Sequence, residues 1–243
     1  FFFKPLFAKV GWMEKPLGHL HPLTQVIYRA VKIFEELGFQ VVTGPERETE
    51  WYNFDALNIP ANHPAREMWD TFWLRESGER RLLRTHTSPV QVRYLEANPP
   101  PVRIIVPGRV FRFEATDATH EAQFYQLEGL LVDKEVTVAE LKGLLEEFLK
   151  KFFGANIQVR FRPSFFPFVE PGLEVDVSFG GEFLEVMGAG LVHPAVLANS
   201  RLDPAAWSGF AFGMGIDRLA MIQYGVPDIR LFYGSDTRFL QQF

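Results

Sequence analysis

The stretch RVFRFEATDATHEAQFYQLEG, residues 109–129, constrains the fold more than any other part of the chain. Both of its flanks alternate as a β-strand requires, and the centre, ATDATHEA, has the small and acidic residues of a loop, so the stretch predicts a β-hairpin. One face of this hairpin would carry Val110, Arg112, Glu114, Phe124, Gln126 and Glu128. A polar face of this kind is either the solvated side of a sheet or the floor of a ligand site, and the isolated Phe124 favours the floor.

The rest of the chain predicts an α+β domain with a mainly antiparallel sheet flanked by helices. Apolar residues repeat at helical spacing in 21–39, between Pro22 and Gly38, and a capping box at Thr137 and Glu140 opens a second helix that Gly154 ends. Strand-like runs follow at QVRFR, LEVDVSF and EFLEVMGAG, and GFAFGMGIDRLAMIQYG indicates a strand entering a helix. In PVRIIVPGRVFRFE we expect two short strands, broken at Pro107 and Gly108.

Composition excludes several classes of protein. The net charge of −5 argues against general nucleic-acid binding through positive charge, so an RNA partner would need a local patch or another subunit. The chain has no cysteine, which excludes disulfides and thiolate metal sites, and no apolar run approaches the roughly 18 residues of a membrane span. A length of 243 residues suits one catalytic-sized domain, which we expect in the cytoplasm.

Three further motifs are weak evidence when each is taken alone. GFAFGMGIDRLAMIQYG lacks the third glycine of a dinucleotide-binding fingerprint and the lysine of a P-loop, but places Arg218 in the first turn of a helix after two glycines. PSFFPFVEPG spaces Phe166 and Phe168 two apart, which suits either core packing or an aromatic pocket. THTSP offers His86 and Ser88 as a helix cap or as polar donors.

Together and in this order, the motifs resemble those of one family. GPERETEWYNFDALNIPANHPAREMWDTFWL, LLRTHTSPVQVRYL, the hairpin, FFPFVEP, GFAFGMGIDRLAMI and GVPDIRLF are similar to the catalytic domain of class II aminoacyl-tRNA synthetases, specifically to bacterial-type phenylalanyl-tRNA synthetase α subunits. The resemblance covers residues 19–243, and we expect residues 1–18 to be an N-terminal extension unlike the family. It implies the class II fold and a ligase that activates phenylalanine with ATP and then transfers it to the 2′-hydroxyl at the 3′ end of tRNA(Phe).

The resemblance also implies roles for individual residues on the ATP side. Arg112, Arg218 and His120 would be the catalytic residues. Arg112 would bind the α-phosphate, Phe124 and Arg218 the two faces of adenine, Glu114 the adenine amino group and His120 the outer phosphates. Mg²⁺ would accompany the phosphates, with Glu185 as its candidate ligand.

On the amino-acid side, the resemblance implies a polar end and an aromatic end. His86, Ser88, Gln126 and Glu128 would fix the ammonium and carboxylate groups of phenylalanine, with Trp69 beside them. Phe166 and Phe168 would meet the substrate ring, and the pocket would be completed by Val169, Ala211 and Gly213.

The implied partners are phenylalanine, tRNA(Phe), a second copy of the chain and a β subunit. We expect no association with a membrane. The second copy would pair through the first long helix and the strand ending at Pro45. Two other readings stay open. One is a synthetase-like paralogue that activates or senses another amino acid without charging tRNA, and the other is a non-enzymatic structural module.

Overall fold

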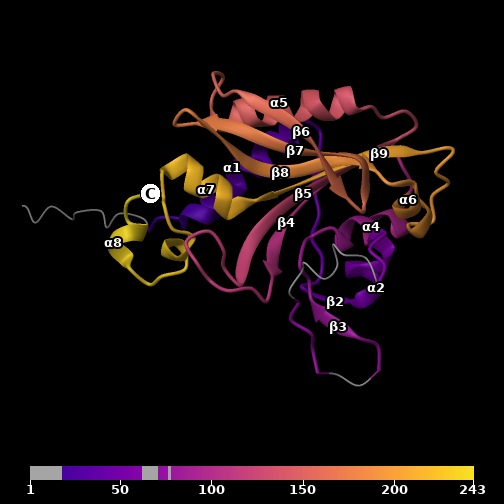
Figure 1. Ribbon diagram of the computed structural model, residues 1–243, viewed down its shortest axis with the longest axis horizontal. Coiled ribbons are helices and arrows are strands. Elements are labelled where there is room, and N and C mark those ends of the chain that lie inside the picture. The colour runs from indigo at the N-terminus through magenta and orange to yellow at the C-terminus, as the bar shows by residue number, and fades with distance from the viewer. Residues whose placement is uncertain (1–17, 62–70, 76–77) are drawn as a thin grey trace, which may run out of the picture.

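The computed structural model describes residues 18–61, 71–75 and 78–243 of the chain. Its centre is a seven-stranded sheet in the order β1-β4-β5-β9-β8-β7-β6 (Figure 1). These strands are β1 (Gln40–Val41), β4 (Val102–Phe111), β5 (Gln123–Asp133), β6 (Val159–Phe166), β7 (Val169–Phe179), β8 (Glu182–Val192) and β9 (Ser208–Gly215). Among the described strands of this sheet, only β1 and β4 pair in parallel, so the prediction of an α+β domain with a mainly antiparallel sheet is confirmed.

The helices and short strands flank this sheet. They are α1 (Pro22–Glu36), β2 (Arg47–Thr49), α2 (Glu50–Asn53), η1 (Asp55–Leu57), β3 (Arg81–Leu83), α4 (Pro89–Ala97), α5 (Val138–Phe153), α6 (Pro194–Asn199), α7 (Ile216–Tyr224), η2 (Ile229–Phe232) and α8 (Thr237–Leu240). The two predicted long helices correspond to α1 and α5, and the Thr137–Glu140 capping box is present. Among the residues that the structure describes, each helix is too short or too polar to cross a bilayer.

Two apolar clusters hold the helices on opposite sides of the sheet. In the first, Phe34 of α1 stacks on Phe148 of α5, with ring centroids 4.3 Å apart, and on Phe212 of β9, at 5.1 Å. The second lies under α2, η1, α4 and α6 and includes Phe54 and Ile104. Figure 1 shows α5 along one side of the sheet and the group of α2, β2, β3 and α4 at the other.

Strand β9 shows how the period of two divides the sheet between core and pocket. Phe210, Phe212 and Met214 belong to the first apolar cluster. The alternating positions Ala211, Gly213 and Gly215 line a cavity, which Phe212 also borders from the core. The register of β9 therefore determines both which residues pack in the core and which residues line the cavity.

Strand β4 corrects the sequence analysis, because Pro107 and Gly108 do not break it. It runs unbroken from Val102 to Phe111, with Pro107 opposite Leu127 of β5. The Ile105 carbonyl accepts a hydrogen bond from Val42 on the β1 side, and Pro107, two positions on, faces the same side beyond the end of β1. A proline at such an edge has no ladder hydrogen bond to lose.

Candidate active site

A cavity of about 660 Å³ lies at the polar end of the β4–β5 hairpin and is closed by the β6–β7 turn, β8, β9 and the start of α7. It brings together nearly all the site residues predicted from the sequence: Ser88, Arg112, Glu114, His120, Phe124, Gln126, Glu128, Phe166, Phe168, Val169, Glu185, Ala211, Gly213 and Arg218. Trp69 lies outside the described residues. His86 is described but does not line the cavity.

Arg112 and Phe124 form the outer floor of the cavity. The hairpin register pairs Val110 with Phe124, and the Arg112 guanidinium lies 5.0 Å from the Phe124 ring centroid. Nε of Arg112 donates to the Thr85 carbonyl at 3.2 Å. Burial lowers the pKa of Arg112, yet an arginine stays protonated in proteins, so this floor combines a fixed cation with a stacking surface.

Glu128 forms the inner floor and is the centre of a buried hydrogen-bond network. Its carboxylate accepts from the Thr87 backbone N–H at 2.9 Å, from the Ser88 hydroxyl and from Nε2 of Gln91 at 3.2 Å. Burial raises the pKa of Glu128, while the hydrogen bonds from Ser88 and Thr87 act in the opposite direction. A carboxylate held in this way presents negative charge to a cationic group of a ligand.

His86 lies in the same buried segment, behind the cavity wall. Burial, and next the Arg112 guanidinium, lower its pKa to about 3, although a hydrogen bond with the Asn53 backbone acts in the opposite direction. The imidazole is therefore neutral near pH 7. Its place in the structure suits support of the wall rather than contact with a ligand.

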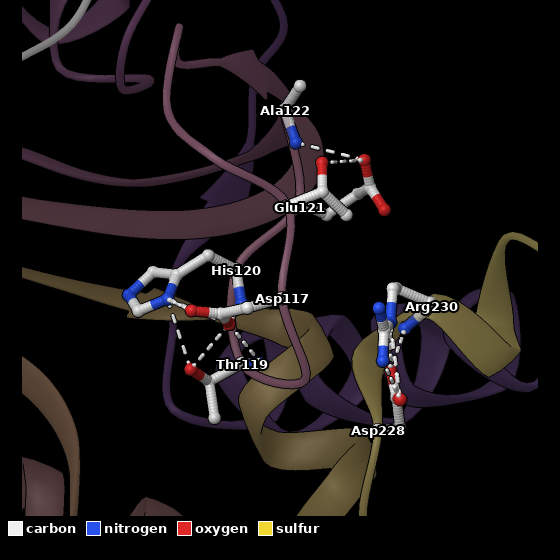
Figure 2. A network of polar contacts seen from close by, with 8 residues as sticks. Asp117, Thr119, His120, Glu121, Ala122, Asp228 and Arg230 are labelled. Atoms are coloured by element: carbon white, nitrogen blue, oxygen red, sulfur yellow. Dashed lines mark hydrogen bonds and ion pairs between the residues drawn. The ribbon is translucent and has the colours of Figure 1, made fainter.

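The hairpin loop carries His120 at the rim of the cavity. Figure 2 shows the polar contacts of His120 with Asp117 and Thr119. Asp117 accepts from the backbone N–H groups of Thr119 and His120, at 2.7 and 2.8 Å, and its carboxylate lies 3.0 Å from Nδ1 of His120. These contacts hold the pKa of Asp117 well below its usual range. The Ile229 backbone N–H donates to the Ala118 carbonyl at 2.9 Å, which ties the loop to η2.

The opposite end of the cavity is aromatic. Phe166 and Phe168 stack with centroids 5.8 Å apart and an interplanar angle of 20°. A Cβ at Gly188 would lie 3.0 Å from the Phe166 ring, so glycine lets this ring lie close to the strand. Ala211 and Val169 complete the apolar wall, which is shaped for a planar apolar group.

Arg218 lies in the first turn of α7, as the glycine-rich stretch predicts, and lines the cavity. Its Nε is 3.4 Å from the Glu185 carbonyl. The preceding residue, Asp217, is buried and accepts from the Tyr125 backbone N–H at 2.8 Å and from the Tyr233 hydroxyl at 2.5 Å. Helix α7 is thereby fixed to β5, the strand that carries Phe124.

A carboxylate pair lies on the β7–β8 side of the cavity. Burial, and next the neighbouring Glu174, raise the pKa of Glu185. Arg162 lies 2.8 Å from the Glu174 carboxylate and 3.8 Å from that of Glu185. Within the described ranges, no three His, Cys, Asp or Glu side chains gather as a metal-binding group. A hard cation held here would therefore need oxygen atoms from the ligand as well.

Sequence reasoning missed several residues that complete the site. Gln91 donates to Glu128 from α4, Glu174 pairs with Arg162, and Asp217 fixes α7. Each acts on a residue more than ten positions away, so no local period marks it. The single available signal was composition, since THTSPVQ and GIDR both place polar residues at helix starts.

Comparisons with known proteins agree with this geometry. The family model of the tRNA synthetases class II core domain (F) matches residues 9–243. The chain is 55% identical to a phenylalanine–tRNA ligase alpha subunit of Dehalococcoides mccartyi (strain CBDB1), over 94% of this chain and 70% of that protein. It is 57% identical to the subunit of the same name from Psychrobacter arcticus, over 93% of this chain and 64% of that protein.

A solved structure supports the fold. Pyrrolysyl-tRNA synthetase from Desulfitobacterium hafniense superposes with a TM-score of 0.68 at 21% identity, over 88% of this chain and 73% of that one. The predicted class II fold is confirmed by this likeness and by the family model.

Proposed function

Because the chain belongs to the family of class II tRNA synthetase core domains (F), we propose that it is a phenylalanine–tRNA ligase that forms phenylalanyl-adenylate from phenylalanine and ATP. The observation that carries the proposal is one cavity holding the Arg112–Phe124 pair, the buried Glu128 and the stacked Phe166–Phe168 pair. These are a phosphate-binding cation with a stacking surface, an ammonium partner and an aromatic wall. Each suits one part of the two substrates.

In the first step, a carboxylate oxygen of phenylalanine attacks the α-phosphorus of ATP. The bond to the bridging oxygen breaks, and pyrophosphate leaves with its electron pair. This reaction needs no protein nucleophile, only alignment and stabilisation of charge. Arg112 would neutralise the α-phosphate, Phe124 and Arg218 would hold the adenine ring, and Glu114 would accept from its amino group. His120 at the rim would contact the outer phosphates.

Phenylalanine would lie between the two ends of the inner cavity. Glu128, Ser88 and Gln126 would hold its ammonium and carboxylate groups, and its ring would meet Phe166 and Phe168. Val169, Ala211 and Gly213 would bound the pocket, and His86 would support its polar end from behind. In the second step, the 2′-hydroxyl at the 3′ end of tRNA(Phe) would attack the carbonyl carbon, and AMP would leave.

The carboxylates of Glu185 and Glu174 fit a magnesium ion shared with the ATP phosphates, since Mg²⁺ typically combines one or two carboxylates with phosphate oxygens. When bound, the ion would neutralise phosphate charge. Arg162 would keep the two carboxylates from repelling each other before the ion binds.

The proposal includes three features of the assembly and its location. Because the curated relatives are named α subunits, we propose a β subunit as a partner in tRNA charging. We propose a homodimer that pairs through α1, on which Tyr28 is 60% exposed, and through the segment leading to Pro45. We propose the cytoplasm as the compartment, where ATP and tRNA are present.

The test is amino-acid-dependent exchange between pyrophosphate and ATP. It uses the purified chain alone and the chain co-expressed with a bacterial β subunit, with phenylalanine, tyrosine and histidine. Exchange with phenylalanine alone is the expected result. Exchange with a different amino acid would favour the paralogue, and no exchange in either preparation would overturn the proposal.

A further inference from the structure

The segment NFDALN, residues 53–58, packs behind the cavity and contacts both of its ends. Most of it is buried, with Asn53 fully inaccessible, Asp55 and Asn58 half-buried and Leu57 lining the cavity. From its outer side, Nδ2 of Asn199 in α6 donates to the carbonyls of Asp55 and Ala56, at 3.3 and 3.2 Å. Helix α6 therefore helps to hold the segment in place.

Asn53 uses both ends of its carboxamide on one residue. Its Nδ2 donates to the Thr85 hydroxyl at 3.0 Å, and its Oδ1 accepts from the Thr85 backbone N–H at 3.2 Å. The Thr85 carbonyl in turn accepts from Nε of Arg112 at 3.2 Å. Asn53 thus sets the position of the carbonyl that orients the Arg112 guanidinium.

Asn58 contacts the aromatic end. It has a left-handed backbone, with φ of 60° and ψ of 31°, which asparagine adopts more readily than most residues. Its Nδ2 donates to the Pro167 carbonyl at 2.7 Å. Pro167 lies between Phe166 and Phe168 in the chain, so this bond fixes the backbone that carries both rings.

We propose that Asn53 and Asn58 are positioning residues for the two substrates, Asn53 for ATP through Thr85 and Arg112, and Asn58 for phenylalanine through Pro167. This inference rests on the proposed function. Five residues apart on one rigid segment, the two asparagines set the distance between the phosphate-binding cation and the aromatic wall. That distance decides whether the carboxylate of phenylalanine meets the α-phosphorus in line.

The experiment separates the two roles by kinetics. The assay is pyrophosphate exchange, normalised to the concentration of active sites found by titration. We expect Asn53→Ala to raise the KM for ATP about 3- to 10-fold, which is the effect of one or two lost hydrogen bonds. The KM for phenylalanine should stay within about twofold of the wild-type value. Asn58→Gly, which keeps the left-handed backbone accessible, does the reverse. Asn98→Ala is the matched control, because within the described part of the chain the Asn98 side chain bonds only to the Tyr94 carbonyl, one helical turn away.

Two variants of Thr85 protect the test against loss of folding. Thr85→Val removes the hydroxyl that accepts from Asn53 Nδ2 but keeps the backbone bond to Asn53 Oδ1, so the KM for ATP rises less than in Asn53→Ala. Thr85→Ser keeps the hydroxyl and should therefore keep wild-type kinetics. Equal changes in both KM values for each asparagine variant, or no change in either, would overturn the inference. A wild-type chain without phenylalanine-dependent exchange would instead refute the proposed function, and ATP affinity by calorimetry would then still test the link from Asn53 to Arg112.

Discussion

Asp217 in α7 accepts a hydrogen bond from the Tyr125 backbone N–H in β5 at 2.8 Å, and each of these residues is the chain neighbour of a pocket residue. Arg218 follows Asp217, and Phe124 precedes Tyr125. One buried carboxylate therefore fixes the spacing between the arginine and the aromatic ring that we assign to the two faces of adenine.

Asp217 gives stability a defined pH dependence. Burial raises its pKa, against the effect of the donors Tyr233 and Tyr125 and the nearby His21. A carboxyl whose pKa is raised on folding contributes stability below its ordinary pKa of about 4, and this contribution is lost as pH rises through the folded value. The free energy of unfolding, wild type minus Asp217→Asn, should therefore fall as pH rises above about 4 in urea titrations. Parallel curves for the two proteins would contradict this.

Glu128→Gln removes the charge but keeps the shape of the ammonium site. We expect the KM for phenylalanine to rise about 10- to 100-fold, the effect of losing a hydrogen bond to a charged group. The affinity for ATP, measured by calorimetry, should change little, and circular dichroism would show that the variant folds. A KM for phenylalanine near the wild-type value would remove Glu128 from the binding site.

Gly213 and Gly215 form a matched pair in β9. A Cβ at Gly213 would lie 3.0 Å from Cγ of Glu128, whereas one at Gly215 would meet Cβ of Arg218 at an ordinary 3.7 Å. Gly213→Ala should displace the Glu128 side chain and weaken phenylalanine binding about tenfold, and Gly215→Ala should weaken it much less. Isothermal titration calorimetry with phenylalanine measures the affinity of both variants. Equal losses of affinity in the two variants would contradict the prediction.

Ala211→Gly enlarges the apolar end of the cavity by one methyl group. We expect the variant to activate para-substituted phenylalanines, because tyrosine is otherwise excluded by a wall that leaves its hydroxyl unpaired or clashing. A competition assay between phenylalanine and its para-chloro analogue measures the change. Unchanged discrimination would count against Ala211 as part of the pocket.

Asp117→Asn tests the loop at the cavity rim. The variant keeps an oxygen that can accept from the Thr119 and His120 backbone N–H groups, but loses the charged partner of the His120 ring. We expect the KM for ATP to rise about 3- to 10-fold while the KM for phenylalanine stays constant, the signature of a change confined to the phosphate side. His120→Ala is the comparison variant. If the effects of Asp117→Asn and His120→Ala on the KM for ATP add fully in the double variant, the two residues act separately, which would contradict the prediction.

The sequence predicted the elements whose signals are local. The periods of α1, α5 and the hairpin flanks, and the capping box at Thr137, each depend on residues within a few positions of one another. The rule that proline breaks a strand failed at Pro107, because whether a missing N–H matters depends on where the neighbouring strand β1 ends. That is a property of the assembled sheet, which no local pattern contains.

The same limit applies to the site. Side chains that face the cavity, such as Arg112 and Phe124, were found because strand alternation and family motifs mark them. The side chains that hold them were missed. Asn53 meets Thr85 across 32 positions, and Asp217 meets Tyr125 across 92, so only the tertiary fold brings them together.

The alternation of core and cavity positions along β9 restricts how a protein of this kind can change over time. A point substitution at Ala211 or Gly213 alters the pocket and leaves Phe210 and Phe212 packed, so the accepted ligand can drift one residue at a time. Insertion or deletion of a single residue in this strand would exchange the two faces, turning phenylalanine rings into the pocket and glycines into the core. We therefore expect insertions and deletions to be tolerated in the connecting loops, and changes in specificity along β9 to come from substitutions at constant length.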